Sequence, residues 1–196
     1  MSRLKSKPKK RILVDLDGIT ADFFGALFRE HRRRTGERVV IDQILSWNMS
    51  SYVKNPKVLM DVFRAKGFFA KLKPLPGAVK ALKRLARSYD VVIATYACTP
   101  HAAAEKILWC QKHLPFLNSN NIILGHRKYL IKADAIIDDG SHNLAAYSRA
   151  WPEALLIAIA YPYNAPGKVC DYYRVEGCND TTKAWDEIVK LIEKTL

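Results

Sequence analysis

Short apolar runs recur along the chain with helical patterns between most of them, and this alternation restricts the fold more than any other feature. The runs are rich in β-branched residues and do not alternate with polar residues, which is typical of strands buried on both faces of a sheet. They are RILVDL (11–16), DVVIATY (90–96), NIILG (121–125), AIIDD (135–139) and LLIAIA (155–160). Strands that alternate with helices predict an α/β fold: a three-layer, doubly wound parallel sheet with helices on both faces.

Helical periodicity is clearest in three segments, residues 77–89, 101–114 and 181–196. In the second of these, the apolar spacing predicts a buried stripe made of Ala104, Ile107, Leu108 and Leu114. The last helix is expected to begin after an N-cap residue, Thr181 or Thr182, because threonine side chains accept hydrogen bonds from the first free backbone N–H groups.

One long segment interrupts the alternation. Residues 23–73 contain helical periodicity, aromatic residues and polar turns, but no convincing strand. We therefore predict three parts: a basic N-terminal tail (1–10), a core made of residues 11–22 and 74–196, and a helical cap (23–73) inserted above the carboxyl edge of the sheet.

Length and composition exclude several classes of protein. A chain of 196 residues with 49% apolar content suits one globular domain with a modest insertion, not a disordered or fibrous protein. The apolar stretch from residue 154 is shorter than the ~20 residues of a membrane span, and the N-terminus lacks the apolar segment of a signal peptide. The four cysteines form no CxxC pair, so we expect reduced thiols in a cytoplasmic protein.

The net charge of +13 indicates an anionic partner or a strongly solvated surface. Much of the charge lies in the tail and in residues 29–38. A solvated tail and helix face would explain it, and so would a positive field that attracts phosphate-bearing ligands. Charge alone does not distinguish a free nucleotide from a nucleic acid.

Polar residues stand where several of the expected strands end or are about to begin. They are Asp15 and Asp17, Thr95 and Tyr96, Lys128, and Asp138 and Asp139. Because ligands of open α/β sheets bind outside the carboxyl ends of the strands, these side chains are expected to converge there. Carboxylates that close repel one another unless a cation lies between them, and Mg²⁺ prefers oxygen ligands. The pattern therefore predicts a Mg²⁺ site.

These residues also carry a family resemblance. DLDGITADFF (15–24) resembles the DxDGxxAD signature of the haloacid dehalogenase-like (HAD) phosphatases, with Thr95, Lys128 and the IDD of 137–139 as the next three motifs in order. GFFAKLKPLPGAV (67–79), KYLIKADAIIDD (128–139) and ILSWNM (44–49) are similar to segments of the 5'(3')-deoxyribonucleotidases and their bacterial relatives. The resemblance covers nearly the whole chain.

The resemblance implies a role for each acid. Asp15 would attack phosphorus and form an aspartyl-phosphate. Asp17 would protonate the leaving alkoxide and then deprotonate the attacking water. Mg²⁺ would be held by the Asp15 side chain, the Asp17 main-chain carbonyl and a carboxylate of the IDD motif, with Asp139 as the direct ligand and Asp138 behind it.

The same resemblance implies a set of phosphate-binding residues, Gly18, Thr95, Tyr96 and Lys128. Gly18 would let the main chain turn closely around the phosphate with N–H groups aimed inward. Lys128 would offset the charge that develops in the transition state. Arg127 and Lys132 are its competitors for that position.

In the cap, Phe23, Trp47 and Phe63 fall where the nucleotidases place aromatic residues over the sugar and base, so a stacked base is expected. For Trp47 and Phe63, packing within the cap is an equal alternative. Phe68 and Phe69 are expected in the core.

The chain departs from the family pattern at three places. Thr95 is followed by Tyr-Ala where animal nucleotidases have Ser-Pro, Gly140-Ser141-His142-Asn143 follows the IDD motif where many relatives carry an arginine, and Phe63 replaces a common tryptophan. These departures leave base and sugar preference open. The five histidines show no metal-ligand spacing and are expected at the surface or in loops.

The sequence thus predicts a Mg²⁺-dependent phosphomonoesterase acting on (deoxy)nucleoside monophosphates. One alternative is a phosphatase acting on another small phosphoester or on a terminal phosphate of a nucleic acid. The other is a basic nucleic-acid-binding module without turnover. No membrane partner is expected, and a homodimer stays open.

Overall fold

The computed structural model describes residues 8–165 and 170–196, and within these ranges the strands form one parallel sheet in the order β3-β2-β1-β4-β5-β6. The strands are β1 (Arg11–Val14), β2 (Asp90–Thr95), β3 (Ile122–Leu124), β4 (Ala135–Ile137), β5 (Leu155–Ile159) and β6 (Tyr173–Val175). The predicted α/β fold and its five strands are confirmed. The sequence did not indicate β6, because this short edge strand has an exposed tyrosine and only one buried residue.

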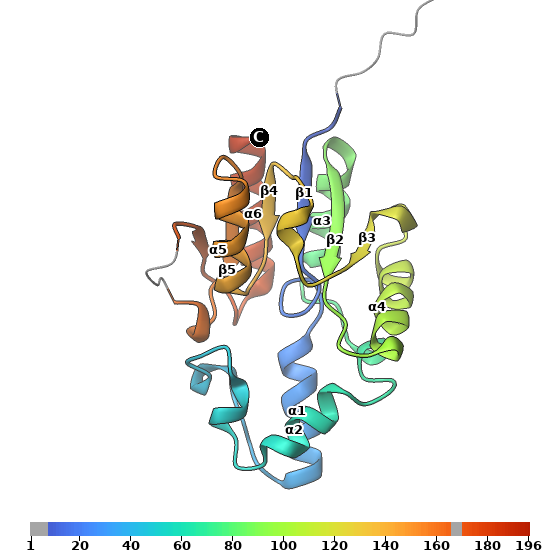
Figure 1. The fold of residues 1–196 in the computed structure, drawn as a ribbon, viewed down its shortest axis with the longest axis vertical. Helices are drawn as coiled ribbons and strands as arrows, with labels where there is room; N and C mark the ends of the chain where they lie inside the picture. The colour runs from blue at the N-terminus through green and yellow to red at the C-terminus, as the bar shows by residue number, and fades with distance from the viewer. Residues whose placement is uncertain (1–7, 166–169) are drawn as a thin grey trace, which may run out of the picture.

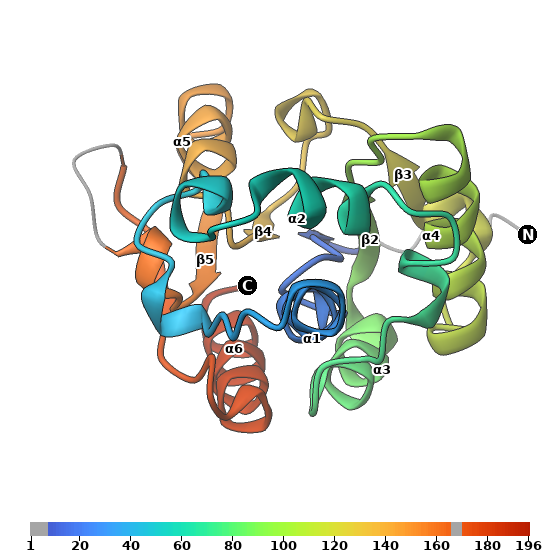
Figure 2. The same ribbon diagram turned by 90° about the horizontal axis from the view of Figure 1, so that it is seen from below.

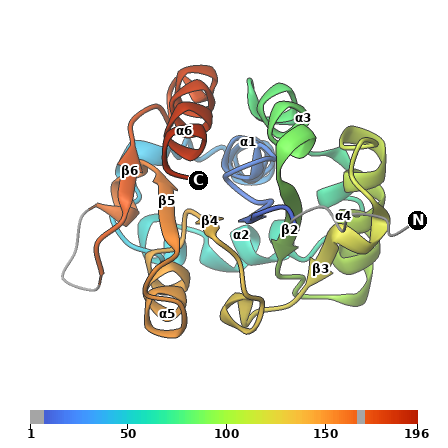
Figure 3. The same cartoon turned by 90° about the horizontal axis from the view of Figure 1, so that it is seen from above.

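Helices cover both faces of the sheet. The helices of the described ranges are α1 (Phe23–Thr35), α2 (Pro56–Phe63), α3 (Ala78–Ser88), α4 (Pro100–His113), α5 (Ser141–Ala150) and α6 (Thr181–Thr195), of which α1 and α2 lie beneath the sheet and not on its faces. Figure 3 shows α3 and α6 on one side of the sheet and α5 on the other. Alternate strand residues follow this division: Ile12 and Val14 pack in the larger core beneath α3, α4 and α6, whereas Leu13 packs in the smaller core beneath α5. Burial on both faces explains why the strands read as continuous apolar runs.

Between residues 23 and 73 the structure has helices and turns but no strand, as expected. Helix α1 begins after Asp22, whose carboxylate accepts a hydrogen bond from the Gly25 N–H, and ends at Gly36 with a positive φ of 75°. Short 3₁₀ turns η1 (Ile41–Gln43) and η2 (Met49–Tyr52) lead to α2, and η3 (Phe69–Lys71) leads back to α3. Figure 1 shows α1 and α2 together beneath the sheet, and Figure 2 shows this segment spread across that end of the molecule.

Three local predictions are wrong. Asp180, not Thr181 or Thr182, caps α6, because its carboxylate accepts a hydrogen bond from the Lys183 N–H while the Thr181 hydroxyl donates to the Pro76 carbonyl. His31 is fully buried on α1, where its ring nitrogen lies 3.0 Å from Glu37.

The third wrong prediction concerns the buried face of α4. Of the predicted stripe, Leu114 is buried and Ile107 is half-buried, whereas Leu108 is 61% exposed and Ala104 is also exposed. The face that α4 buries instead consists of Ala102, Glu105, Lys106, Trp109 and Cys110. The apolar spacing therefore gave the wrong face of this helix.

Phe68 and Phe69 are buried, as expected. All four cysteines are free thiols. None of the helices in the described ranges is both long and apolar enough to cross a membrane. Residues 1–7, most of the predicted tail, lie outside the described residues.

Candidate active site

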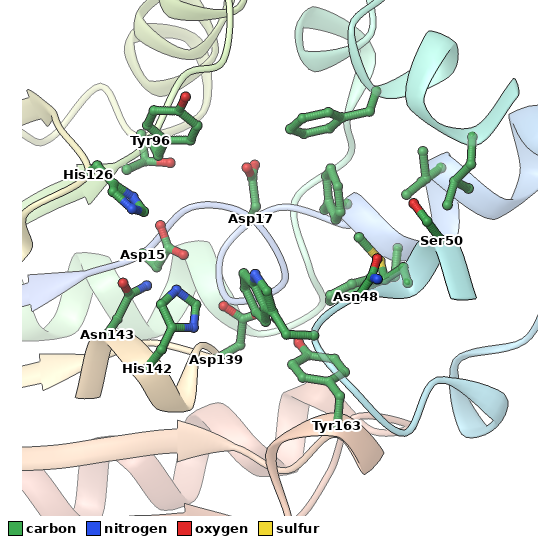
Figure 4. Close-up of a pocket in the computed structure, with 18 of the residues that line it drawn as sticks. Asp15, Asp17, Asn48, Ser50, Tyr96, His126, Asp139, His142, Asn143 and Tyr163 are labelled. Atoms are coloured by element: carbon green, nitrogen blue, oxygen red, sulfur yellow. The ribbon is translucent and has the colours of Figure 1, made fainter. Parts of the chain in front are cut away.

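A cavity of about 450 Å³ lies between the carboxyl end of the sheet and the helical segment 23–73. Nine of the predicted site residues line it: Asp15, Asp17, Phe23, Trp47, Phe63, Thr95, Tyr96, Lys128 and Asp139. In Figure 4 the carboxylates lie toward one end, and Asn48 and Ser50 of the helical segment lie toward the other. The sheet thus contributes the charged end of the cavity, and the helical segment contributes the apolar end.

The parallel register brings the first and fourth motifs together. Asp15 follows β1 directly, and its N–H extends the sheet by donating to Ile137 at the end of β4. Asp138 and Asp139 follow that same strand. Carboxylates that are far apart in sequence therefore meet because β1 and β4 are neighbours.

Lys128 lies between two of these acids. It opens the turn η5 (Lys128–Leu130) and is buried, with its ammonium nitrogen 2.9 Å from Asp15 Oδ1 and 2.5 Å from Asp138 Oδ2. Of the two competing residues, Lys132 instead lies over the Trp151 ring, 5.2 Å from its centroid. The structure therefore places Lys128, and not Lys132, at the acids.

Asp138 and Asp139 have different surroundings. Both Asp138 oxygens are occupied, since Oδ2 accepts from Lys128 and Oδ1 accepts from the Gly140 N–H and the Asn143 side chain. Within residues 8–165 and 170–196, Asp139 accepts a single side-chain hydrogen bond, from the Tyr163 hydroxyl to Oδ2 at 2.5 Å. Asp139 lines the cavity and Asp138 does not.

Burial perturbs the acids. The pKa of Asp15 is raised to about 6, chiefly by desolvation, with Lys128 opposing the shift and the neighbouring aspartates adding to it. Desolvation and the charges of Asp15 and Asp138 also raise the pKa of Asp139 well above its ordinary value. Lys128 keeps a raised pKa despite its desolvation, because Asp138 and Asp15 attract its charged form.

The donor set fits a hard dication. Asp15, Asp138 and Asp139 each offer a carboxylate oxygen, and these oxygens all lie within 4.8 Å of one another. The end of the cavity gathers four aspartates and two lysines: Asp15, Asp17, Asp138, Asp139, Lys106 and Lys128. Four negative charges and two positive ones leave a net charge of −2 when all are ionised. Oxygen-rich, doubly negative clusters match the preference of Mg²⁺.

Lys106 was not predicted as a site residue. It is 1% exposed, and its ammonium nitrogen lies 2.5 Å from Asp17 Oδ2, 3.0 Å from Thr95 Oγ1 and 2.5 Å from the Tyr96 carbonyl oxygen. The sequence could have indicated its burial through helical spacing, because Lys106 lies on the same face of α4 as Ala102, Trp109 and Cys110, which are buried.

Gly18 does not face the cavity. Its φ of 72° permits the tight turn, but its N–H donates to the Ala21 carbonyl and its own carbonyl accepts from the Tyr161 hydroxyl. A Cβ on Gly18 would meet the Phe24 ring at 2.7 Å and Asp139 Oδ2 at 3.0 Å. The requirement for glycine here is therefore close packing behind the acids.

Aromatic residues form the apolar end of the cavity. Phe23 is buried, and its ring makes edge contacts with Phe24, Phe63 and Phe68 at centroid distances of 5.2 to 5.9 Å. Trp47 is 52% exposed and is not part of the core. Its ring contacts His142 at 4.6 Å and Tyr163 at 5.6 Å.

Several lining residues were not singled out as site residues, and among them are His126, His142, Asn143 and Tyr163 (Figure 4). His142 and Asn143 belong to the segment that replaces the arginine of many relatives, on α5 directly after the acids. His126 packs against Tyr96, with 5.2 Å between the ring centroids.

The solved structures similar to this chain establish its fold. A presumed HAD-hydrolase of Bacillus subtilis bound to magnesium superposes with a TM-score of 0.60 at 14% identity, covering 95% of this chain and 99% of that one. A haloacid dehalogenase-like family hydrolase from Streptococcus pneumoniae superposes with a TM-score of 0.52 at 15% identity, covering 78% of this chain and 85% of that one. The fold is therefore HAD-like, as the sequence motifs predicted.

Sequence comparison is more specific. The 5'(3')-deoxyribonucleotidase of Bacillus subtilis is 28% identical over 159 residues, which cover 80% of this chain and 88% of the relative. A presumed 5'(3')-deoxyribonucleotidase of Staphylococcus epidermidis is 26% identical over 184 residues, 93% of this chain and 99% of the relative. The family model described as "5' nucleotidase, deoxy (Pyrimidine), cytosolic type C protein" matches residues 9–195. The chain belongs to this 5' nucleotidase family.

Proposed function

We propose that this protein is a Mg²⁺-dependent phosphomonoesterase that hydrolyses nucleoside or deoxynucleoside monophosphates through an aspartyl-phosphate intermediate. The observation that carries the proposal is the end of the cavity where Asp15 meets Lys128 at 2.9 Å beside Asp139. A carboxylate nucleophile, a fixed cation and an oxygen-ligand set are what phosphoryl transfer requires. The names of the relatives support a nucleotide as the substrate.

Asp15 is the proposed nucleophile. Its Oδ1 accepts a hydrogen bond from the Leu16 N–H and lies 2.9 Å from the Lys128 ammonium nitrogen. No hydrogen bond of the described residues uses Oδ2, which leaves this oxygen to attack phosphorus. Attack forms the O–P bond of the aspartyl-phosphate while the bond from phosphorus to the nucleoside oxygen breaks.

Asp17 is the proposed acid and base. One of its oxygens, Oδ2, is bound to Lys106, and the other, Oδ1, is buried without a partner in the described part of the chain. The protonated Asp17 would give its proton to the leaving oxygen, and the resulting carboxylate would take a proton from the water that hydrolyses the intermediate.

Two side chains are placed to hold the phosphate. Because the Thr95 hydroxyl oxygen accepts from Lys106, its own hydrogen is free to be donated to a phosphate oxygen. Lys128 would balance the added negative charge in the transition state. Tyr96 lines the cavity next to Thr95 and would border the phosphate.

Asp15, Asp139 and the main-chain carbonyl of Asp17 would hold Mg²⁺, which when bound polarises the phosphoryl group and offsets its charge. Asp138 would not bind the metal directly but would hold Lys128 and the Gly140 N–H in place, because both of its oxygens already accept hydrogen bonds. The magnesium bound to the Bacillus subtilis structure of the same fold supports this choice of metal.

The helical segment 23–73 is the proposed cap, with Phe23, Trp47 and Phe63 against the nucleoside. A cavity of about 450 Å³ lies within the range of roughly 300–1,000 Å³ that small-molecule sites occupy. This size favours a mononucleotide over a polynucleotide. The four free thiols fit a reducing compartment and support a cytoplasmic location, which we propose for the protein.

A phosphate-release panel tests the proposal. The substrates are deoxynucleotides, ribonucleotides, sugar phosphates and oligonucleotides phosphorylated at either end, each assayed with Mg²⁺ and with EDTA. We expect the highest kcat/KM for a nucleoside monophosphate and loss of turnover in EDTA. Undiminished turnover in EDTA would refute the metal assignment, and a preference for oligonucleotides would favour the nucleic-acid alternative that the net charge of +13 suggests.

A further inference from the structure

Lys106 is the most thoroughly buried lysine of the described chain, and nothing in the proposed reaction yet requires it. It lies in the middle of α4, on the face that packs against the core. Burying an ammonium group costs several kcal/mol even after relaxation, unless paired charges and hydrogen bonds compensate. An apolar residue at this position would fill the core without that cost, so the position of the charge needs a reason.

All three N–H groups of the Lys106 ammonium have an acceptor. Asp17, Thr95 and the Tyr96 carbonyl receive one bond each, at 2.5 to 3.0 Å. These acceptors come from the loop after β1 and from the end of β2, two elements that frame the phosphate position. A single side chain therefore fixes the two residues that would act on the substrate's leaving oxygen and on its phosphate.

The bond to Asp17 is asymmetric. Lys106 holds Oδ2, whereas Oδ1 has no partner among residues 8–165 and 170–196. An ion pair to one oxygen restricts the rotation of the carboxylate and leaves the other oxygen without a hydrogen-bond partner among the described residues. Figure 4 shows the Asp17 side chain projecting between the acids and the rings of the helical segment, where the scissile bond of a substrate would lie.

The support for Lys106 is itself rigid. The preceding residue, Glu105, is also buried, and its carboxylate accepts hydrogen bonds from the Gly67 and Phe69 N–H groups at 2.6 and 3.1 Å. The Phe69 ring lies 4.5 Å from the Lys106 ammonium nitrogen. The same turn of α4 thus holds the chain segment that returns from the helical cap and holds Asp17.

We propose that Lys106 is a positioning residue that orients Asp17 for proton transfer to the leaving oxygen. The inference rests on the proposed function, since it assigns Asp17 the role of acid. It does not require Lys106 to touch the substrate. It requires that the loss of Lys106 act through Asp17.

The leaving group provides the test. An alkoxide such as a nucleoside oxygen needs a proton as it departs, whereas p-nitrophenolate leaves without one. Lys106→Met removes the charge and the hydrogen bonds but keeps the length of the side chain. We expect kcat/KM for a nucleoside monophosphate to fall about 100-fold and kcat/KM for p-nitrophenyl phosphate to fall less than about 10-fold. Equal losses for the two substrates would show that Lys106 only maintains the fold and would overturn the proposal.

A double-mutant cycle provides the second readout. If Lys106 acts through Asp17, then Lys106→Met should cost little further activity in an Asp17→Asn background. Additive losses would contradict the proposal. Lys112→Met is the matched control, because Lys112 is exposed on the same helix, and it should leave both rates unchanged.

Folding is followed for every variant by far-UV circular dichroism and thermal unfolding. If Lys106→Met does not fold, Lys106→Gln takes its place, because its amide can still donate a hydrogen bond without the charge. If the wild type releases phosphate only from another alkyl phosphate, the nucleotide assignment fails, and the same comparison with that alkyl substrate still decides the role of Lys106.

Discussion

The two ends of the cavity are built on different principles. At the sheet end, charged side chains are buried and bound to one another, as Lys128 is to Asp15 and Asp138. At the cap end, the rings of Phe23 and Trp47 contact other aromatic residues and make no side-chain hydrogen bond within the described part of the chain. The sheet end permits one arrangement, because moving any member leaves a buried charge unpaired. The cap end permits many, because apolar rings repack at small cost.

Under the proposed function, this difference would assign the chemistry to the sheet end and the selectivity to the cap end. Phosphoryl transfer requires fixed charges at fixed positions, whereas discrimination between nucleosides requires a shape. Changes at the sheet end should therefore alter kcat strongly, and changes at the cap end should alter KM modestly. The four predictions below test that contrast, in order of decreasing effect.

The largest effect is expected from the nucleophile. Asp15→Asn keeps the size of the side chain and the Leu16 hydrogen bond but removes the attacking carboxylate. Phosphate release from the preferred nucleotide should fall by about 10⁴-fold or more, since a covalent route loses its first step. Asp61→Asn is the control, because Asp61 lies on the exposed side of α2. A variant that keeps the wild-type rate would show that Asp15 is not the nucleophile.

The second-largest effect is expected from removal of the Lys128 ammonium group. Lys128→Met leaves Asp15 and Asp138 without their shared counterion, so the rate should fall by about 10²- to 10³-fold. The free energy of unfolding should also fall, by about 3 kcal/mol, because carboxylates are left buried and unpaired. Lys132→Met serves as the control and should keep the rate. Equal losses in the two variants would remove the distinction between these lysines.

A smaller effect concerns the metal and pH. Unfolded aspartate loses its proton near pH 3.8, whereas folded Asp15 keeps its proton up to about pH 6, chiefly because it is desolvated. Asp15 in the folded state therefore binds more protons in this window, and its contribution to the stability of the metal-free protein should fall as pH rises from about 4 to about 6. Asp139, whose pKa is also raised, acts in the same direction.

In the proposed site, Mg²⁺ would bind the deprotonated acids and offset their repulsion. The rise in Tm on adding MgCl₂ should therefore be larger at about pH 8 than at about pH 5, because protons compete with the metal at low pH. Thermal unfolding of EDTA-treated protein with and without MgCl₂ measures this difference. A rise that is larger at about pH 5 than at about pH 8 would argue against a carboxylate metal site.

The same contrast explains what the sequence could predict. Asp15, Thr95 and Asp139 were identified because they stand at strand ends, and a parallel sheet brings strand ends together whatever the loops do. Lys106 was missed because a lysine on a helix is ordinarily exposed, and its partner Asp17 is 89 positions away. The face of α4 was wrong for the same reason: its buried side carries Glu105 and Lys106, which an apolar stripe does not include.

In the cap, the sequence offered no such rule. Phe23, Trp47 and Phe63 all line the cavity, yet their burial differs widely and no strand register fixes their positions. Whether an aromatic residue packs inward or borders a ligand depends on neighbours such as His142 and Tyr163, which come from distant segments. Only the folded chain shows those contacts.

Substitution of Trp47 should have the smallest effect on activity. Its ring is half exposed and borders the cavity, so Trp47→Ala should change the free energy of unfolding by less than about 0.5 kcal/mol. Loss of a ring that stacks on the base should raise KM by roughly 10-fold, equivalent to about 1.4 kcal/mol, and leave kcat nearly unchanged. Leu45→Ala is the matched control, because Leu45 is 64% exposed and does not line the cavity. A large fall in kcat with unchanged KM would place chemistry at the cap end and break the division between the two ends of the site.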